Sequence, residues 1–123
     1  MTKIQSSKRY DLEERTFLFA QRVKEYVKKL PKTIFNIEYG KQLIRSSGSQ
    51  AANYIEANES LGKKDFMMRI KICRKESKES RLWLKLTEPP ESQLNEQEKL
   101  IVESFELTKI FGAILEKYKN RLI

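Results

Sequence analysis

Long stretches of this chain contain no residue that breaks a helix, and this spacing limits its possible folds more than any other feature. Only four Gly and three Pro occur in 123 residues, too few for the frequent turns of a β-sandwich or barrel. The strongest breakers are Pro31, Gly62 and Pro89-Pro90, and they divide the chain into four segments of helical length. The sequence therefore predicts an all-α protein.

Start signals and breakers predict the ends of four helices. Asp11 and Glu14 form a D-x-x-E start signal, and Asn36, Gly62 and Ser92 are candidate N-caps for the later helices. The predicted helices cover residues 11–30, 37–61, 63–87 and 92–121, preceded by a flexible N-terminal arm at residues 1–10. Because short connections make neighbouring helices antiparallel, we expect residues 11–123 to form an antiparallel up-down four-helix bundle.

Apolar residues recur at three- and four-residue steps in these segments, as in amphipathic helices. The first stripe is Leu12, Thr16, Phe19, Ala20, Val23, Tyr26, Val27 and Leu30. In the second segment one face holds Leu43, Ile44, Ser47, Ala51, Tyr54, Ile55, Asn58 and Leu61. The small residues opposite indicate that another helix approaches closely, and Gly48 is expected to have a packing role because Gly destabilises a helix.

The last two predicted helices carry more apolar surface than one core needs. The core stripe of the third is Phe66, Ile70, Cys73, Ser77, Ser80 and Leu84, and a second stripe contains Met68, Ile72, Trp83 and Leu86. The apolar arc of the fourth covers about half the helix, where about 100° would face one core. We expect this extra surface to mediate self-association.

The chain has no His and a single Cys, Cys73, and these two counts exclude many kinds of site. Zinc fingers, Ser-His-Asp and Cys-His nucleophile pairs, His-containing di-iron sites and disulfides within the chain are impossible. We expect no catalytic residue, no metal and no cofactor. The first ten residues lack the apolar region of a signal peptide, and no apolar run could span a membrane, so we expect a cytoplasmic protein with no membrane partner.

Basic residues cluster on one side of the third predicted helix, in a chain with a formal net charge of +8. This face consists of Lys71, Arg74, Lys75, Lys78 and Lys85, with Arg81 at its margin. Such a row could follow the phosphate backbone of RNA or DNA, although Lys-rich faces also keep bundles soluble. The face has no interleaved aromatic residues for base stacking, which argues against sequence-specific reading of single strands.

Polar residues on the second and third predicted helices allow a structural and a functional interpretation. Two carboxylate pairs at i,i+3 spacing are Glu56 with Glu59 and Glu76 with Glu79. They could hold a metal or act as acid and base, but we favour a structural ion pair between Glu76 or Glu79 and a basic residue of another helix. Asn53, Tyr54 and Asn58 either line a site or, as we favour, fix the bundle register by hydrogen bonds. The candidates for oligomer contacts or bundle specificity are Asn53, Glu56, Ile72, Glu76, Glu79 and Trp83.

Two segments resemble a known family of bacterial proteins. Residues 42–57, QLIRSSGSQAANYIEA, resemble the second-helix signature of four-helix-bundle proteins named for the 23S rRNA intervening sequence in which some are encoded. Residues 64–66, KDF, and 75–86, KESKESRLWLKL, are similar to the third helix of that family. With weaker similarity in the last helix, the resemblance covers about residues 15–118.

This resemblance implies an antiparallel four-helix bundle that assembles as a homopentamer in relatives. The accessory protein of diversity-generating retroelements belongs to the same superfamily and binds nucleic acid and a reverse transcriptase. Recurring family positions without an agreed role match Asn53, Glu56, Glu76, Glu79 and Trp83. The chain differs from many relatives at Gly62, where they have a Ser cap.

Three hypotheses for function follow. The first is a non-enzymatic, self-associating bundle whose basic face binds nucleic acid, RNA before DNA, through phosphate contacts. The second is a protein-interaction scaffold in which the charge serves only solubility. The third, which we favour least, is an enzyme that uses the Glu pairs with a hard metal ion.

Overall fold

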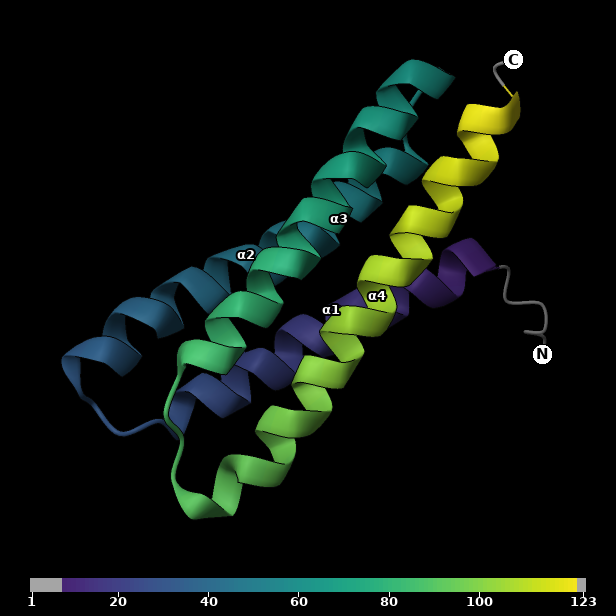
Figure 1. The fold of residues 1–123 in the computed structure, drawn as a ribbon. Helices are drawn as coiled ribbons and strands as arrows, with labels where there is room; N and C mark the ends of the chain where they lie inside the picture. The colour runs from purple at the N-terminus through teal and green to yellow at the C-terminus, as the bar shows by residue number, and fades with distance from the viewer. Residues whose placement is uncertain (1–7, 122–123) are drawn as a thin grey trace, which may run out of the picture.

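The computed structural model describes residues 8–121, which form an antiparallel four-helix bundle (Figure 1). The helices are α1, Lys8–Lys28; α2, Ile34–Asn58; α3, Lys63–Leu86; and α4, Leu94–Arg121, with a short 3-10 helix at Glu91–Gln93. No strand occurs within this range, so the all-α prediction is confirmed. Residues 1–7 of the predicted N-terminal arm lie outside the described residues, whereas residues 8–10 belong to α1.

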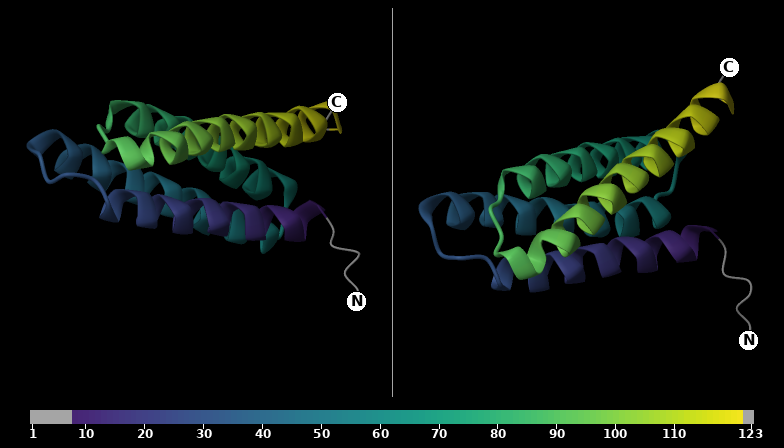
Figure 2. Two further views of the ribbon diagram at one scale, coloured as in Figure 1. Left: turned by 90° about the horizontal axis from the view of Figure 1, so that it is seen from below. Right: turned by 60° about the horizontal axis from the view of Figure 1, so that its bottom comes forward.

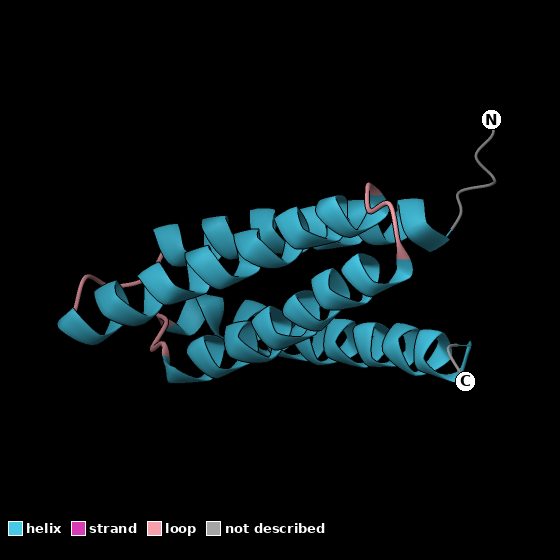
Figure 3. Ribbon diagram, turned by 90° about the horizontal axis from the view of Figure 1, so that it is seen from above, coloured by secondary structure: helices cyan, strands magenta, loops and turns pink. Residues whose placement is uncertain are grey.

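Each helix packs against its two neighbours, so that α1 and α3 lie at opposite corners of the bundle. Short loops connect the helices at the two ends (Figure 3). Toward its C-terminal end α4 diverges from α1 (Figure 2). Two ion pairs join these helices where they run closer together, from Arg15 Nε to Glu103 Oε2 at 2.7 Å and from Arg22 Nε to Glu96 Oε2 at 3.0 Å. No described helix is long and apolar enough to span a bilayer.

The start of α2 differs from the prediction, because Thr33 and not Asn36 is its N-cap. Thr33 Oγ1 accepts a hydrogen bond from Asn36 N at 3.1 Å, so α2 begins at Ile34, before the predicted residue 37. The Asn36 side chain is buried and bonds to the backbone of the α3–α4 connection. The helix also ends at Asn58, before the predicted residue 61.

The later helix ends agree more closely with the sequence. Gly62 is the N-cap of α3, with Asp65 in the first turn, as predicted, and Thr87 is the C-cap. Ser92 does not cap α4, because it lies inside the 3-10 helix that precedes Leu94. The chain therefore makes one tight turn after Pro90 before the regular helix begins.

The core confirms the predicted stripes of α1 and α3. Fully or almost fully buried side chains include Phe19, Val23, Tyr26, Ile70, Cys73, Leu84, Leu100, Leu107 and Phe111. On α2, however, Ile44 and Ile55 were expected in the core and are 49% and 51% exposed. The predicted close approach explains the difference, because α3 packs against the small residues and Ser46 Oγ lies 2.8 Å from Ser80 Oγ.

Gly48 does not have the packing role that the sequence suggested. It is exposed, and a Cβ atom at this position would meet nothing within 4 Å. The close approach of Gly40 to Val27 is the tighter contact, since a Cβ there would lie 3.2 Å from the Val27 side chain. The glycine that packing requires on α2 is therefore Gly40.

Candidate nucleic-acid interface

The basic residues of α3 form a continuous row along the flank that borders α4. Their positions, 71, 74, 78, 81 and 85, follow the three- and four-residue steps that place side chains on one face of a helix. In total α3 carries nine Lys or Arg and three Asp or Glu side chains, a net charge of +6 for this helix alone. The net charge of this one helix is thus three quarters as large as the +8 of the whole chain.

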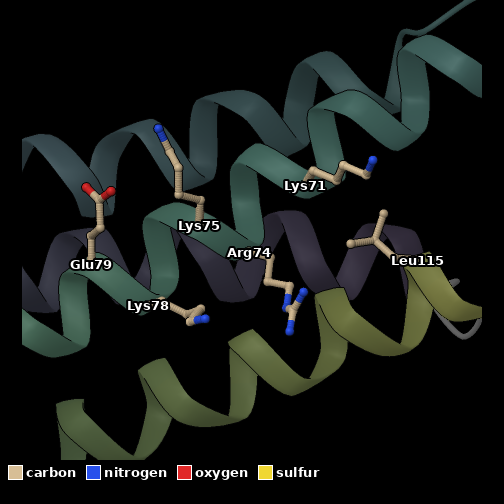
Figure 4. Close-up of a pocket in the computed structure, with 6 residues that line it drawn as sticks. All are labelled: Lys71, Arg74, Lys75, Lys78, Glu79 and Leu115. Atoms are coloured by element: carbon tan, nitrogen blue, oxygen red, sulfur yellow. The ribbon is translucent and has the colours of Figure 1, made fainter.

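Four of the six predicted basic residues line one hollow. Its volume is about 450 Å³, and it is lined by Lys71, Arg74, Lys75, Lys78, Glu79 and Leu115. We call these four cations and the hollow between them the basic groove. Arg74 points toward α4, while Lys75 points toward the α2 side (Figure 4). Arg81 and Lys85 continue the row beyond the groove and do not line it.

The cations of the basic groove have few carboxylate partners. Lys75 Nζ lies 3.8 Å from Glu76 Oε2, its sequence neighbour. Among the side chains that the structure describes, no carboxylate lies within 4.0 Å of Lys71, Arg74 or Lys78. Three of the four groove cations therefore have no carboxylate partner, and their positive charge is available to an anion.

Residues of α4 that the sequence did not assign to the basic face complete this surface. The guanidinium carbon of Arg81 lies 4.7 Å from the ring centroid of Phe105, and Lys109 Nζ lies 5.0 Å from the same centroid. At Gly112 an added Cβ atom would lie 3.7 Å from Arg74 Nε, so this arginine crosses to α4 where α4 has no side chain. Because neighbouring helices are antiparallel, residues at equal distances before and after the connection of the third and fourth segments lie side by side, and this rule could have identified Phe105.

The Glu76 and Glu79 carboxylates confirm the predicted structural ion pair. Arg45 of α2 places Nη2 3.6 Å from Glu76 Oε1 and 3.4 Å from Glu79 Oε1. The Glu76 side chain is only 5% exposed, and Ser49 Oγ donates a hydrogen bond of 3.4 Å to its Oε2. A buried carboxylate needs such a cation, so this cluster holds α2 and α3 together.

The asparagines of α2 bond across the bundle, as we favoured. Asn53 Oδ1 accepts a 2.9 Å hydrogen bond from Arg69 of α3, and Asn58 Nδ2 donates one of 2.6 Å to Glu13 of α1. Tyr54 is buried beside Phe111, with ring centroids 6.1 Å apart. These contacts link α2 to all three other helices.

The remaining oligomer candidates lie on the surface shared by α2 and α3. Trp83 is half-buried and stacks on Tyr39, with ring centroids 5.8 Å apart and planes 23° apart. Ile72 is half-buried and Glu56 is exposed. Leu86, about one turn after Trp83 on α3, is 39% exposed, so apolar surface is present beside Trp83.

Within residues 12–119, whose side chains are described, the acidic residues and Cys73 are the groups that could bind a metal or act as a nucleophile. No group of three or more Cys, Asp or Glu side chains in this range could hold a metal ion. Burial raises the pKa of the Cys73 thiol to about 12, so it is a protonated core group at neutral pH, as predicted. The cationic surface is the chemically distinctive feature.

Fold and surface together define a basic, antiparallel four-helix-bundle protein. The family model for the 23S rRNA-intervening sequence protein matches residues 8–113, and the chain therefore belongs to that family. The structure is also similar to a crystal structure from Bacteroides thetaiotaomicron VPI-5482, described as a protein with unknown function from the S23 ribosomal protein family. The TM-score is 0.76 at 25% sequence identity, over 89% of this chain and 99% of the other. No curated protein matches the sequence.

Proposed function

We propose that this protein is a non-enzymatic, self-associating helical bundle that binds nucleic acid through phosphate contacts in the basic groove. The observation that carries the proposal is the convergence of four cationic side chains on one hollow. Three of them have no carboxylate within 4.0 Å among the described side chains. The proposal favours RNA because the family is named for an intervening sequence of 23S rRNA.

Self-association would increase the affinity of each groove without new contacts. The apolar surface beside Trp83, which includes Leu86, is our proposed contact between copies. An assembly that repeats the basic groove could bind one nucleic-acid chain at several points, which raises the overall affinity by an effective-concentration effect. The grooves are open for this purpose, because Lys71, Arg74 and Lys78 are all exposed.

Charge reversal in the basic groove tests the proposal. A variant in which Lys71, Arg74, Lys75 and Lys78 are each replaced by Glu should lose binding to labelled RNA in fluorescence anisotropy. Helix content by circular dichroism should stay unchanged, because all four side chains are exposed. The matched control changes the same charge on and just after α1, the helix diagonal to α3, by replacing Lys24, Lys28, Lys29 and Lys32 with Glu.

The control variant should keep most of the RNA affinity, losing only the weak long-range attraction that salt screens. Equal loss in both variants would show that only net charge matters, and this would contradict the assignment of the groove. If the nuclease-treated wild-type protein bound no nucleic acid at moderate salt, the protein-scaffold hypothesis would replace the proposal.

A further inference from the structure

We propose that the basic groove and the Phe105 ring beyond its end together select single-stranded nucleic acid over duplex, with one base stacked at Phe105 and adjacent phosphates held by Arg81 and Lys109. The inference rests on the proposed nucleic-acid binding and adds the form of nucleic acid that the surface takes. It starts from the pairing of α3 with α4, which places an aromatic ring beside a row of cations that has no aromatic residue of its own.

Phe105 is accessible and fixed in position. Its side chain is 41% exposed, although most large aromatic residues of a small bundle are needed in the core. A hydrogen bond of 2.9 Å between Ser77 of α3 and Thr108 of α4 fixes the register of the two helices. Because Arg81 follows Lys78 by about one turn, the ring extends the line of the basic groove.

The Arg81 side chain is arranged to serve a ligand. Its guanidinium lies over the Phe105 ring, and no described carboxylate lies within 4.0 Å of it. A guanidinium that an aromatic ring holds in place loses less freedom when its N–H groups bind a phosphate. Lys109 adds a second cation at 5.0 Å from the ring centroid. Its Nζ also lies 3.3 Å from Glu106 Oε2, an exposed ion pair that a phosphate can displace because such pairs contribute little.

The contact that a base can make here favours a single strand. A duplex keeps its bases stacked inside and could touch only the exposed lysines. A single strand can turn its bases outward to stack on aromatic and guanidinium planes, and Leu115 adds apolar lining to the hollow.

The test compares Phe105→Leu with wild type in fluorescence anisotropy, using labelled oligouridine, oligothymidine and a duplex of equal length. Stacking of one base contributes ~1–3 kcal/mol, so loss of the ring should weaken single-strand binding by about 5- to 150-fold. Duplex affinity should change by less than about twofold, because the cations remain. Oligouridine and oligothymidine distinguish a ligand that needs the 2′-hydroxyl from one that does not.

Phe17→Leu is the matched control, because Phe17 is 55% exposed on α1, the helix diagonal to α3. This change should leave the affinity for single strands and for duplex unchanged. The inference is overturned if Phe105→Leu leaves single-strand affinity unchanged or lowers single-strand and duplex affinity equally. The proposed function survives that result as long as charge reversal in the basic groove still abolishes binding. Binding of neither form by the wild-type protein would overturn both.

Discussion

Asn36 and Glu88 are joined by hydrogen bonds in both directions. Asn36 Nδ2 donates to Glu88 O at 3.0 Å, and Glu88 N donates to Asn36 Oδ1 at 2.8 Å. The same Nδ2 also donates to Pro31 O at 3.0 Å. One buried amide thus ties the α1–α2 connection to the α3–α4 connection at the same end of the bundle, and it satisfies backbone groups that the two loops would otherwise leave without partners.

Replacement of Asn36 by Ala should destabilise the bundle by about 2–4 kcal/mol. The change removes three hydrogen bonds and leaves their backbone groups without partners. Asn36 is only 3% exposed, and an unpaired buried group costs about 1–3 kcal/mol. Urea unfolding measures the effect as a lower midpoint at an unchanged m value. Asn95→Ala, at an exposed position on α4, is the control, and equal stability of the two variants would show that the link is not needed.

The contact between Arg45 and Glu76 should appear as a coupling energy in a double-mutant cycle. Arg45→Ala leaves the Glu76 carboxylate, which is 5% exposed, without its inter-helix cation and should cost about 1–3 kcal/mol. In a Glu76→Gln background the same change should cost only a few tenths, giving a coupling of about 1 kcal/mol. Glu79→Gln is the matched control because Glu79 is 36% exposed, and a coupling of equal size there would contradict the importance of burial.

Cys73 should resist thiol reagents in the folded protein and lower the stability at alkaline pH. Burial is the main cause that raises its pKa from an ordinary value of 9.0 to about 12. Between these values the unfolded chain loses the thiol proton and the folded chain keeps it, so stability falls as pH rises. Denaturation at pH 8 and pH 10 should show a larger loss for wild type than for Cys73→Ala. Rapid labelling of the folded protein at pH 8 would contradict the burial.

The apolar surface around Trp83 should determine the native mass. Trp83→Ala should lower the mass measured by light scattering, but this change also removes the stacking on Tyr39. Leu86→Glu tests the same surface without disturbing the core, because Leu86 is 39% exposed, and it should lower the mass at unchanged melting temperature. Leu18→Glu, on α1 and 43% exposed, is the control. A mass that changes only in the control would place the contact on a different face.

Apolar periodicity predicted the four helices well because the spacing of apolar residues within each helix indicates which of its faces is buried. The stripe of α3 from Ile70 to Leu84 is buried as expected. The predicted basic partner of Glu76 from another helix is Arg45. The predicted N-cap of α2 was wrong because Thr33 and Asn36 are both suitable N-cap residues. The hydrogen bond from Asn36 to Glu88, far away in the sequence, decides between them.

Features that depend on how two helices meet could not be predicted from either helix alone. Ile44 and Ile55 fit a helical stripe, but the small residues around Ser46 allow α3 to approach so closely that these two side chains face outward. The basic row of α3 was identified, whereas its aromatic neighbour Phe105 belongs to α4 and comes into place only through the register of the two helices.

The salt dependence of RNA binding tests the central claim most directly. Four cations line the basic groove, and each phosphate that is neutralised on a single strand lowers log K by about 0.7 per unit of log salt concentration. Anisotropy titrations of the nuclease-treated protein over a salt series should therefore give a slope near −3 per groove, and replacement of Lys78 by Gln should make the slope less steep by about 0.7. Affinity that is independent of salt, or a slope unaffected by Lys78→Gln, would contradict phosphate binding by this surface.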